Sequence, residues 1–228
     1  MSKNRKRPLQ PTCAIISLGC PKNLVDSEQM LGRLRAAGYR WVVEPEGADV
    51  VVINTCGFLD TAREESLDVV RQMADLKRRG RLGRIVVAGC MAQRDGPSLL
   101  EACPEIDRVM GVFARDEIAA VARQLAEEKP GRGETDRVLL AKQPDDALVD
   151  DCREPLTPPH VAYLKIAEGC DRLCAFCSIP AIRGRYQSKP IDQVVDEASR
   201  LAQSGVRELV LIAQDTSYYG RDLGPGPR

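Results

Sequence analysis

Short runs of apolar, mostly β-branched residues alternate along the first half of the chain with stretches whose apolar residues recur every three or four positions. Unbroken apolar runs are typical of strands buried on both faces, and the wider spacing is typical of amphipathic helices. Strands are therefore predicted over residues 13–18, 49–54, 84–88, 107–110 and 137–140. Helices are predicted over residues 26–37, 61–79 and 114–128, the second beginning at a capping box of Thr61 and Glu64. Such alternation predicts an α/β domain built on a parallel sheet.

The pattern changes between residues 141 and 159, where four prolines stand among five acidic side chains. Beyond this segment we expect a strand over 161–167, an irregular cysteine-rich loop, a helix over 191–203 and a strand over 208–213. The predicted organisation is an N-terminal α/β domain over residues 1–142, an acidic proline-rich linker over 143–159 and an incomplete second domain over 160–228.

Composition narrows the class of protein. The 228 residues are 43% hydrophobic, and 33 basic residues balance 33 acidic ones, which excludes a polyanion-coating role for the whole chain. The basic segment 1–8 is followed by no apolar stretch, and apolar runs reach only about five residues, so neither a secretory signal nor a membrane span is predicted. We therefore expect a cytoplasmic protein, in which clustered cysteines indicate metal binding or catalysis rather than disulfides. The single histidine excludes multi-histidine zinc sites.

Three of the nine cysteines, Cys20, Cys56 and Cys90, each follow a predicted strand and adjoin a glycine. The carboxyl ends of parallel strands lie along one edge, so these thiols are expected to approach one another there. A free cysteine is also a common small buried residue, and core packing is the alternative for each of them. Three at one edge favour a site.

The second cysteine group is Cys170, Cys174 and Cys177, spaced C-x3-C-x2-C after the predicted strand 161–167. Four-ligand zinc sites usually consist of two closely spaced pairs, whereas three thiolates on one loop suit a [4Fe–4S] cluster with one open iron. A zinc site completed by His160 or Cys152 is the alternative. The remaining cysteines, Cys13, Cys103 and Cys152, are expected to be inert. The basic run over residues 77–84 is predicted to be either an RNA contact or a solvated helix end.

At these residues the chain resembles the methylthiotransferases of the radical S-adenosylmethionine (SAM) superfamily. The C-x3-C-x2-C loop resembles the superfamily signature, and the three earlier cysteines resemble the cluster ligands of the methylthiotransferase domain. Residues 17–28, 167–184 and 214–220 resemble the branch that modifies an aspartate of small-subunit ribosomal protein 12. The tRNA-modifying branch typically carries Gln-Met-Asn where this chain has Pro21, Lys22 and Asn23.

The resemblance implies a transferase with two [4Fe–4S] clusters and SAM as cofactors. Cys170, Cys174 and Cys177 would hold one cluster, which binds SAM and cleaves it to a radical that abstracts a hydrogen from the β-carbon of the aspartate. Cys20, Cys56 and Cys90 would hold the other, which carries the sulfur to be methylated and transferred. Phe176 would pack near the adenine of SAM.

The resemblance also implies a fold and a set of partners. We expect the N-terminal parallel-sheet domain to be followed by the start of a radical SAM partial (β/α) barrel, with the rest of the barrel and a terminal TRAM domain absent. A monomer is expected, acting on ribosomal protein 12 or the ribosomal subunit and reduced by a flavodoxin or ferredoxin. A tRNA methylthiotransferase and a non-catalytic metal-binding fragment are the alternatives. An unprotected last strand predicts poor solubility.

Overall fold

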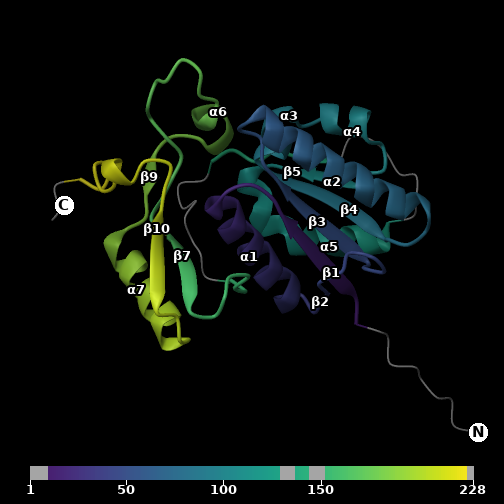
Figure 1. The fold of residues 1–228 in the computed structure, drawn as a ribbon, viewed down its shortest axis with the longest axis horizontal. Helices are drawn as coiled ribbons and strands as arrows, with labels where there is room; N and C mark the ends of the chain where they lie inside the picture. Colours follow the sequence, from purple (N-terminus) through teal and green to yellow (C-terminus); the bar gives the residue numbers. More distant parts are fainter. Residues whose placement is uncertain (1–9, 129–136, 144–151, 225–228) are drawn as a thin grey trace, which may run out of the picture.

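The computed structural model describes residues 10–128, 137–143 and 152–224, and its largest feature is a parallel sheet (Figure 1). Its strand order is β2-β1-β3-β4-β5-β6, with every neighbouring pair parallel. The strands are β1 (Thr12–Ser17), β2 (Arg40–Trp41), β3 (Val50–Thr55), β4 (Arg84–Gly89), β5 (Arg108–Met110) and β6 (Val138–Leu139).

Helices cover both faces of this sheet. They are α1 (Pro21–Ala36), α2 (Asp60–Arg78), α3 (Cys90–Asp95), α4 (Ser98–Ala102), a 3-10 helix (Val112–Glu117) and α5 (Ile118–Glu127). Val51 and Ile53 of β3 pack with α2, α3 and α4 on one face, while Val50 and Val52 pack with α1 and α5 on the other. Because side chains alternate along a strand, a strand covered on both sides buries every residue: all of β3 is buried, apolar over residues 50–53 and polar at Asn54 and Thr55.

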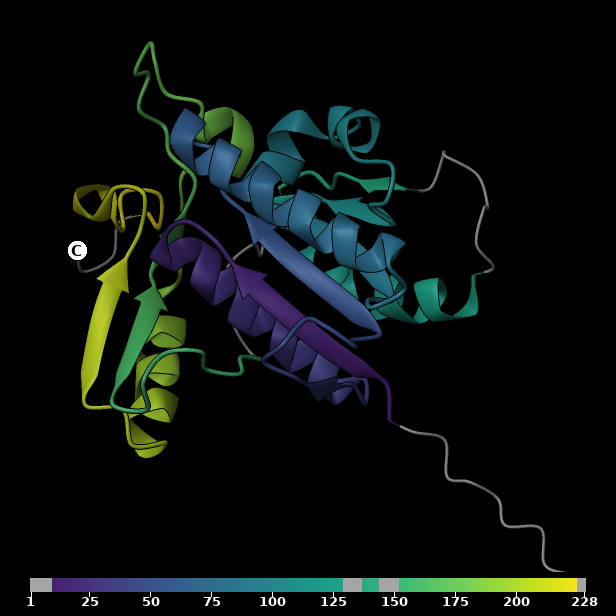
Figure 2. The ribbon, with the colours of Figure 1, turned by 45° about the vertical axis from the view of Figure 1, so that its right-hand side comes forward.

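A second, smaller unit follows. It contains β7 (Val161–Lys165), β8 (Ala167–Glu168), α6 (Ile179–Arg183), β9 (Gln187–Ser188), α7 (Ile191–Gln203), β10 (Glu208–Ile212) and a 3-10 turn (Thr216–Tyr218). Strands β7 and β10 pair in parallel around α7, which is a β/α/β unit, and β8 pairs with β9 antiparallel. Figure 2 shows β10 at the outer edge of this unit, with β7 between it and the N-terminal sheet.

Most predicted elements are confirmed to within a few residues, and α7 has the predicted bounds. Two details are wrong. Helix α1 begins five residues early, because Pro21 supplies a preset first-turn conformation. The Thr61–Glu64 capping box does not form: α2 begins at Asp60 after Leu59, without a side-chain cap, so Thr61 already lies within the first turn.

The linker is described only in part, and residues 144–151 lie outside the described ranges. Residues 152–156 run along α1: Cys152 faces Gly32, where a Cβ would lie 2.2 Å from the Cys152 carbonyl oxygen, and the Glu154 amide donates to the Glu28 carbonyl at 3.0 Å. This stretch therefore packs against the N-terminal unit. Within the described ranges, no helix is both long and apolar enough to cross a membrane.

Candidate functional site

The three strand-end cysteines follow three neighbouring strands. Cys20 caps the start of α1 after β1, Cys56 directly follows β3, and Cys90 is the first residue of α3 after β4. Since β3 pairs with both β1 and β4, these positions lie side by side at the carboxyl edge of the sheet. The predicted juxtaposition of the three chain segments is present.

Glycines allow the strand ends to come this close. A Cβ on Gly19, whose φ is +88°, would lie 2.8 Å from the Cβ of Cys56, and a Cβ on Gly57 would lie 2.8 Å from the carbonyl oxygen of Cys90. Real Cβ atoms do not tolerate such distances, so each glycine is required where one cysteine segment meets the next. Three thiols on closely spaced loops are a donor set that fits an iron–sulfur cluster.

The second cysteine group occupies an irregular loop between β8 and α6. The Cys170 amide donates to Gly184 and the Cys177 amide to Cys174, each at 3.1 Å, so the loop returns on itself. Cys174 is exposed, and the side chain of Phe176 is 89% exposed. The contact of Phe176 with a bound adenine therefore stays a prediction. Over the described ranges, no three or more histidine, cysteine or acidic side chains are gathered as a ready metal site.

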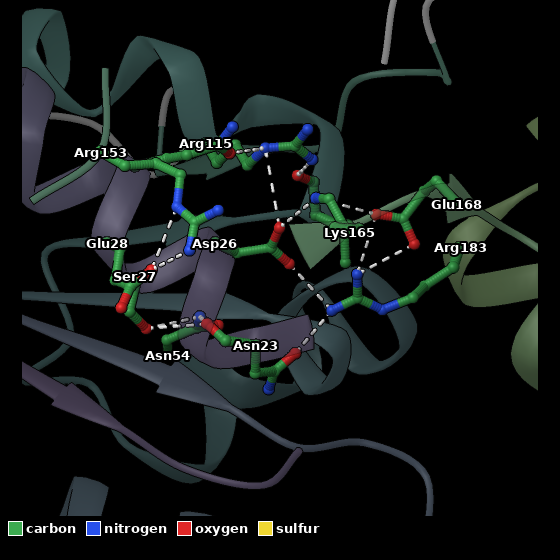
Figure 3. Close-up of polar contacts among 12 residues, drawn as sticks. Asn23, Asp26, Ser27, Glu28, Asn54, Arg115, Arg153, Lys165, Glu168 and Arg183 are labelled. Carbon is green, nitrogen blue, oxygen red and sulfur yellow. Dashed lines mark hydrogen bonds and ion pairs between the residues drawn. The ribbon is translucent and has the colours of Figure 1, made fainter. Parts of the chain in front are cut away.

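A network of buried charges joins the two units (Figure 3). Asp26 of α1 accepts from Lys165 of β7 at 3.0 Å and from Arg183 of α6 at 2.9 Å, and it lies 3.8 Å from Arg115. Glu168 of β8 accepts from Arg183 at 3.1 and 3.2 Å and from Lys165 at 3.3 Å. Burial opposes the charge of both carboxylates, but the surrounding cations hold the pKa of each below its usual range.

A second set of buried ion pairs extends this interface. Arg153 donates at 2.5 Å to Glu28 of α1 and at 2.5 Å to Glu197 of α7, and Glu197 also accepts from Lys189. Two carboxylates and two cations therefore form a chain from one unit to the other. Removing one member of such a chain leaves its partner charged in a low-dielectric interior, which is strongly unfavourable.

Arg183 connects this network to the strand-end cysteines. Its Nε donates to the sulfur of Cys90 at 3.2 Å, and the Cys90 thiol in turn lies 3.5 Å from Oδ1 of Asn23. Burial raises the pKa of the Cys90 thiol, and the Arg183 guanidinium opposes that rise. At the same edge, Lys22 donates to the carbonyl of Ala213, just beyond β10, at 3.2 Å. The carboxyl ends of β10 and β1 thus approach each other across the interface.

The remaining candidate residues are explained by core packing or by surface ion pairs. Cys13 and Cys103 are buried, and burial raises the pKa of Cys13 to about 11, which keeps it a protonated core residue. Most of the basic run is paired: Lys77 and Arg84 pair with Asp107, Arg78 with Asp75 and Glu105, and Arg81 with Glu46. The prediction of a solvated helix end is therefore favoured over an RNA contact.

Two family models match the chain. Residues 12–111 match "Uncharacterized protein family UPF0004", and residues 164–224 match the "Radical SAM superfamily". The ribosomal protein uS12 methylthiotransferase RimO of Symbiobacterium thermophilum is 50% identical over 91% of this chain, and that of Myxococcus xanthus is 46% identical over 94%. The chain is a relative of the RimO proteins. It spans 42% and 43% of the length of these two RimO proteins.

A solved structure supports the fold. The radical SAM methyltransferase TsrM from Kitasatospora setae, determined with cobalamin and a [4Fe–4S] cluster bound, superposes with a TM-score of 0.59 at 14% identity. The match covers 90% of this chain and 49% of TsrM. The predicted fold class, a parallel-sheet α/β domain followed by the start of a radical SAM barrel, is confirmed by this likeness and by the RimO relatives.

Asp26, Lys165, Glu168 and Arg183 have no predicted role, although Asp26, Glu168 and Arg183 lie within the motifs that carry the family resemblance. One signal for them is the composition of α1, in which Asn23, Asp26, Ser27, Glu28 and Gln29 are buried among apolar residues. A run of buried polar side chains requires partners, and here several of those partners come from the second unit.

Proposed function

We propose that this chain carries the cluster-binding part of a radical SAM methylthiotransferase that modifies the β-carbon of an aspartate in small-subunit ribosomal protein 12. The printed names of its RimO relatives support the transferase class and the ribosomal protein substrate. Cys170, Cys174 and Cys177 would hold one [4Fe–4S] cluster, and Cys20, Cys56 and Cys90 a second. When bound, these clusters and SAM supply a carbon-centred radical and the sulfur and methyl group of the product.

The observation that supports this proposal best is the arrangement of the two cysteine groups. One group lies at the carboxyl edge of β1, β3 and β4, the other follows β8, and Arg183 contacts the first group from the helix that follows the second. The residues of this chain would thus hold both clusters beside one interface. Phe176 would cover the adenine of SAM once the exposed loop binds it. A flavodoxin or ferredoxin would supply electrons to a cytoplasmic monomer.

The test is the iron and acid-labile sulfide content after anaerobic reconstitution. We expect about eight irons per chain, falling to about four in a Cys20→Ala/Cys56→Ala/Cys90→Ala variant and to about four in a Cys170→Ala/Cys174→Ala/Cys177→Ala variant. A Cys13→Ala/Cys103→Ala variant is the matched control and should retain about eight. About four irons in both the unchanged chain and the first variant would refute the second cluster.

The substrate is tested separately. A full-length RimO relative in which the segment that matches this chain is replaced by this chain should add a methylthio group to ribosomal protein 12, detected by mass spectrometry of its peptides. Methylthiolation of tRNA without modification of ribosomal protein 12 would contradict the proposed substrate.

A further inference from the structure

Every N–H of the Arg183 guanidinium has an acceptor, and one of these acceptors is a sulfur. The side chain is almost completely buried, and a guanidinium carries five N–H donors in a rigid planar fork. Nη1 donates to both oxygens of Glu168, and Nη2 donates to Asp26 at 2.9 Å and Asn23 at 2.5 Å. The remaining donor, Nε–H, is aimed at the sulfur of Cys90 at 3.2 Å.

The position of this donor is fixed from both units. Glu168 belongs to β8 of the second unit, whereas Asp26 and Asn23 belong to α1 of the first. The two ends of the fork are therefore held by partners on opposite sides of the interface (Figure 3). Because the guanidinium is planar, these bonds also set the direction of Nε–H.

A neutral thiol is a weak acceptor, and a thiolate is a strong one. Arg183 would therefore interact more strongly with Cys90 as a cluster ligand than with the free thiol. Reduction of a cluster adds a negative charge, which a nearby cation and a hydrogen bond to a ligand sulfur both stabilise. The network beside Cys90 supplies such an environment, because it contains three cations and two carboxylates. The cations are Lys165, Arg115 and Arg183, and the carboxylates are Asp26 and Glu168.

We propose that Arg183, a residue of the radical SAM unit, is a positioning residue for the cluster of the N-terminal unit: it donates to the sulfur of Cys90 and raises the reduction potential of that cluster. The inference rests on the proposed function, because it requires Cys90 to be a cluster ligand. It assigns to the second unit a part in the chemistry of the first.

The test is a redox titration of the N-terminal cluster alone. In the Cys170→Ala/Cys174→Ala/Cys177→Ala background, Arg183→Met should lower the ratio of reduced to oxidised cluster at least tenfold at the potential where the parent is half reduced. This corresponds to a downward shift of about 59 mV for one electron. Arg183→Lys keeps the charge but loses the planar fork, so its shift should be smaller. Arg185→Met is the matched control, because Arg185 lies in the adjoining segment with a side chain 91% exposed, and it should not shift the potential.

A measurement that keeps Arg183 in place covers the case in which Arg183→Met fails to fold. In the same cysteine background with ¹⁵N-labelled arginine, pulsed electron paramagnetic resonance of the reduced cluster should detect coupling to an arginine nitrogen. Arg183→Lys should abolish that coupling.

The outcomes separate the two proposals. Failure of the background chain to bind about four irons would overturn the proposed function and this inference with it. Full iron content with an arginine coupling absent, or with the potential of Arg183→Met equal to that of Arg185→Met, would overturn the inference alone.

Discussion

Asp26 is buried at the meeting point of three cations, Lys165, Arg183 and Arg115. Asp26→Asn would leave these cations without one of their two shared carboxylates, so we expect the free energy of unfolding to fall by about 3–5 kcal/mol. Asp68→Asn is the control, because the exposed Asp68–Arg71 pair contributes about 0–0.5 kcal/mol. Urea denaturation of the two variants measures both values. Equal losses would show that the buried network does not stabilise the fold.

The same carboxylate gives stability a defined pH dependence. The folded pKa of Asp26 is below its usual range because Lys165, Arg183 and Arg115 outweigh the effect of burial, whereas an unfolded aspartate has a pKa of about 3.9. Below about pH 4 the unfolded chain therefore takes up a proton that the folded chain does not. The contribution of Asp26 should be complete above about pH 4 and fall as the pH drops further. Asp26→Asn should make this acid limb shallower in urea titrations between pH 5 and pH 2, and an unchanged slope would contradict the assignment.

Gly89 lies where the end of β4 meets the end of β3. Its φ is +94°, and a Cβ there would lie 2.7 Å from the Thr55 carbonyl oxygen. Gly47 has a φ of +81° but no atom within 4 Å of such a Cβ, so Gly47→Ala isolates the backbone strain of about 1–2 kcal/mol. Gly89→Ala should cost about 1–3 kcal/mol more because of the clash. The difference between the two melting curves measures that excess, and identical curves would rule out the close approach.

At the scale of elements, the sequence predicts best where one pattern decides the structure. Strand β3 begins with four apolar residues because it is covered on both faces, and α7 has one apolar face, so the bounds of both could be predicted closely. Helix α1 is different, because its buried residues include Asn23, Asp26 and Glu28, and no periodicity of apolar residues marks its first turn. The two-residue strands β2 and β9 are too short to carry a pattern at all.

Strand β10 is the exposed edge of the second unit. It pairs on one side with β7, and the side chain of Leu211 is 55% exposed. Because an apolar open edge favours pairing with other chains, Leu211→Glu should reduce aggregation at high protein concentration without a loss of stability above about 0.5 kcal/mol. Ile212→Glu is the contrasting variant, since Ile212 is buried and its substitution should unfold the unit. Sedimentation velocity measures association, and an unchanged profile for Leu211→Glu would locate the adhesive surface elsewhere.

At the scale of the whole molecule, buried charges join the two units beside a small apolar contact of Ile182 with Val112 and Cys90. Glu28 accepts from Arg153 and from the Leu156 amide, so Glu28→Ala removes several links at once. The protein has a single tryptophan, Trp41 in β2, whose fluorescence therefore reports the N-terminal unit, while circular dichroism reports both units. The two signals should coincide during unfolding of the parent and separate in Glu28→Ala. Separate transitions in the parent would show that the units unfold independently. Glu154→Ala, which removes a more exposed pair with Arg35, is the control.

The sequence also indicates the site only in part, and for a physical reason. The carboxyl ends of the strands in a parallel sheet share one edge, so the proximity of Cys20, Cys56 and Cys90 could be predicted from the sequence. The contact between Arg183 and Cys90 depends on how the two units dock, which no local pattern along the chain encodes. The sequence shows the docking only indirectly, through charged residues at positions where an apolar interface would have leucine or valine.

The pairing of Arg183 with Cys90 has a consequence for biosynthesis. The two residues are 93 positions apart, so at about 5–20 residues per second the arginine is made on the order of 5–20 s after the cysteine. During that interval the N-terminal sheet emerges from the ribosome with its three thiols but without the cation that would accompany them. Under the proposed role of Arg183, metal delivered in this interval would meet an unfinished pocket. That role therefore predicts that the cluster held by Cys20, Cys56 and Cys90 is completed after translation of the second unit, and that a nascent chain stalled before residue 183 lacks the cation beside it.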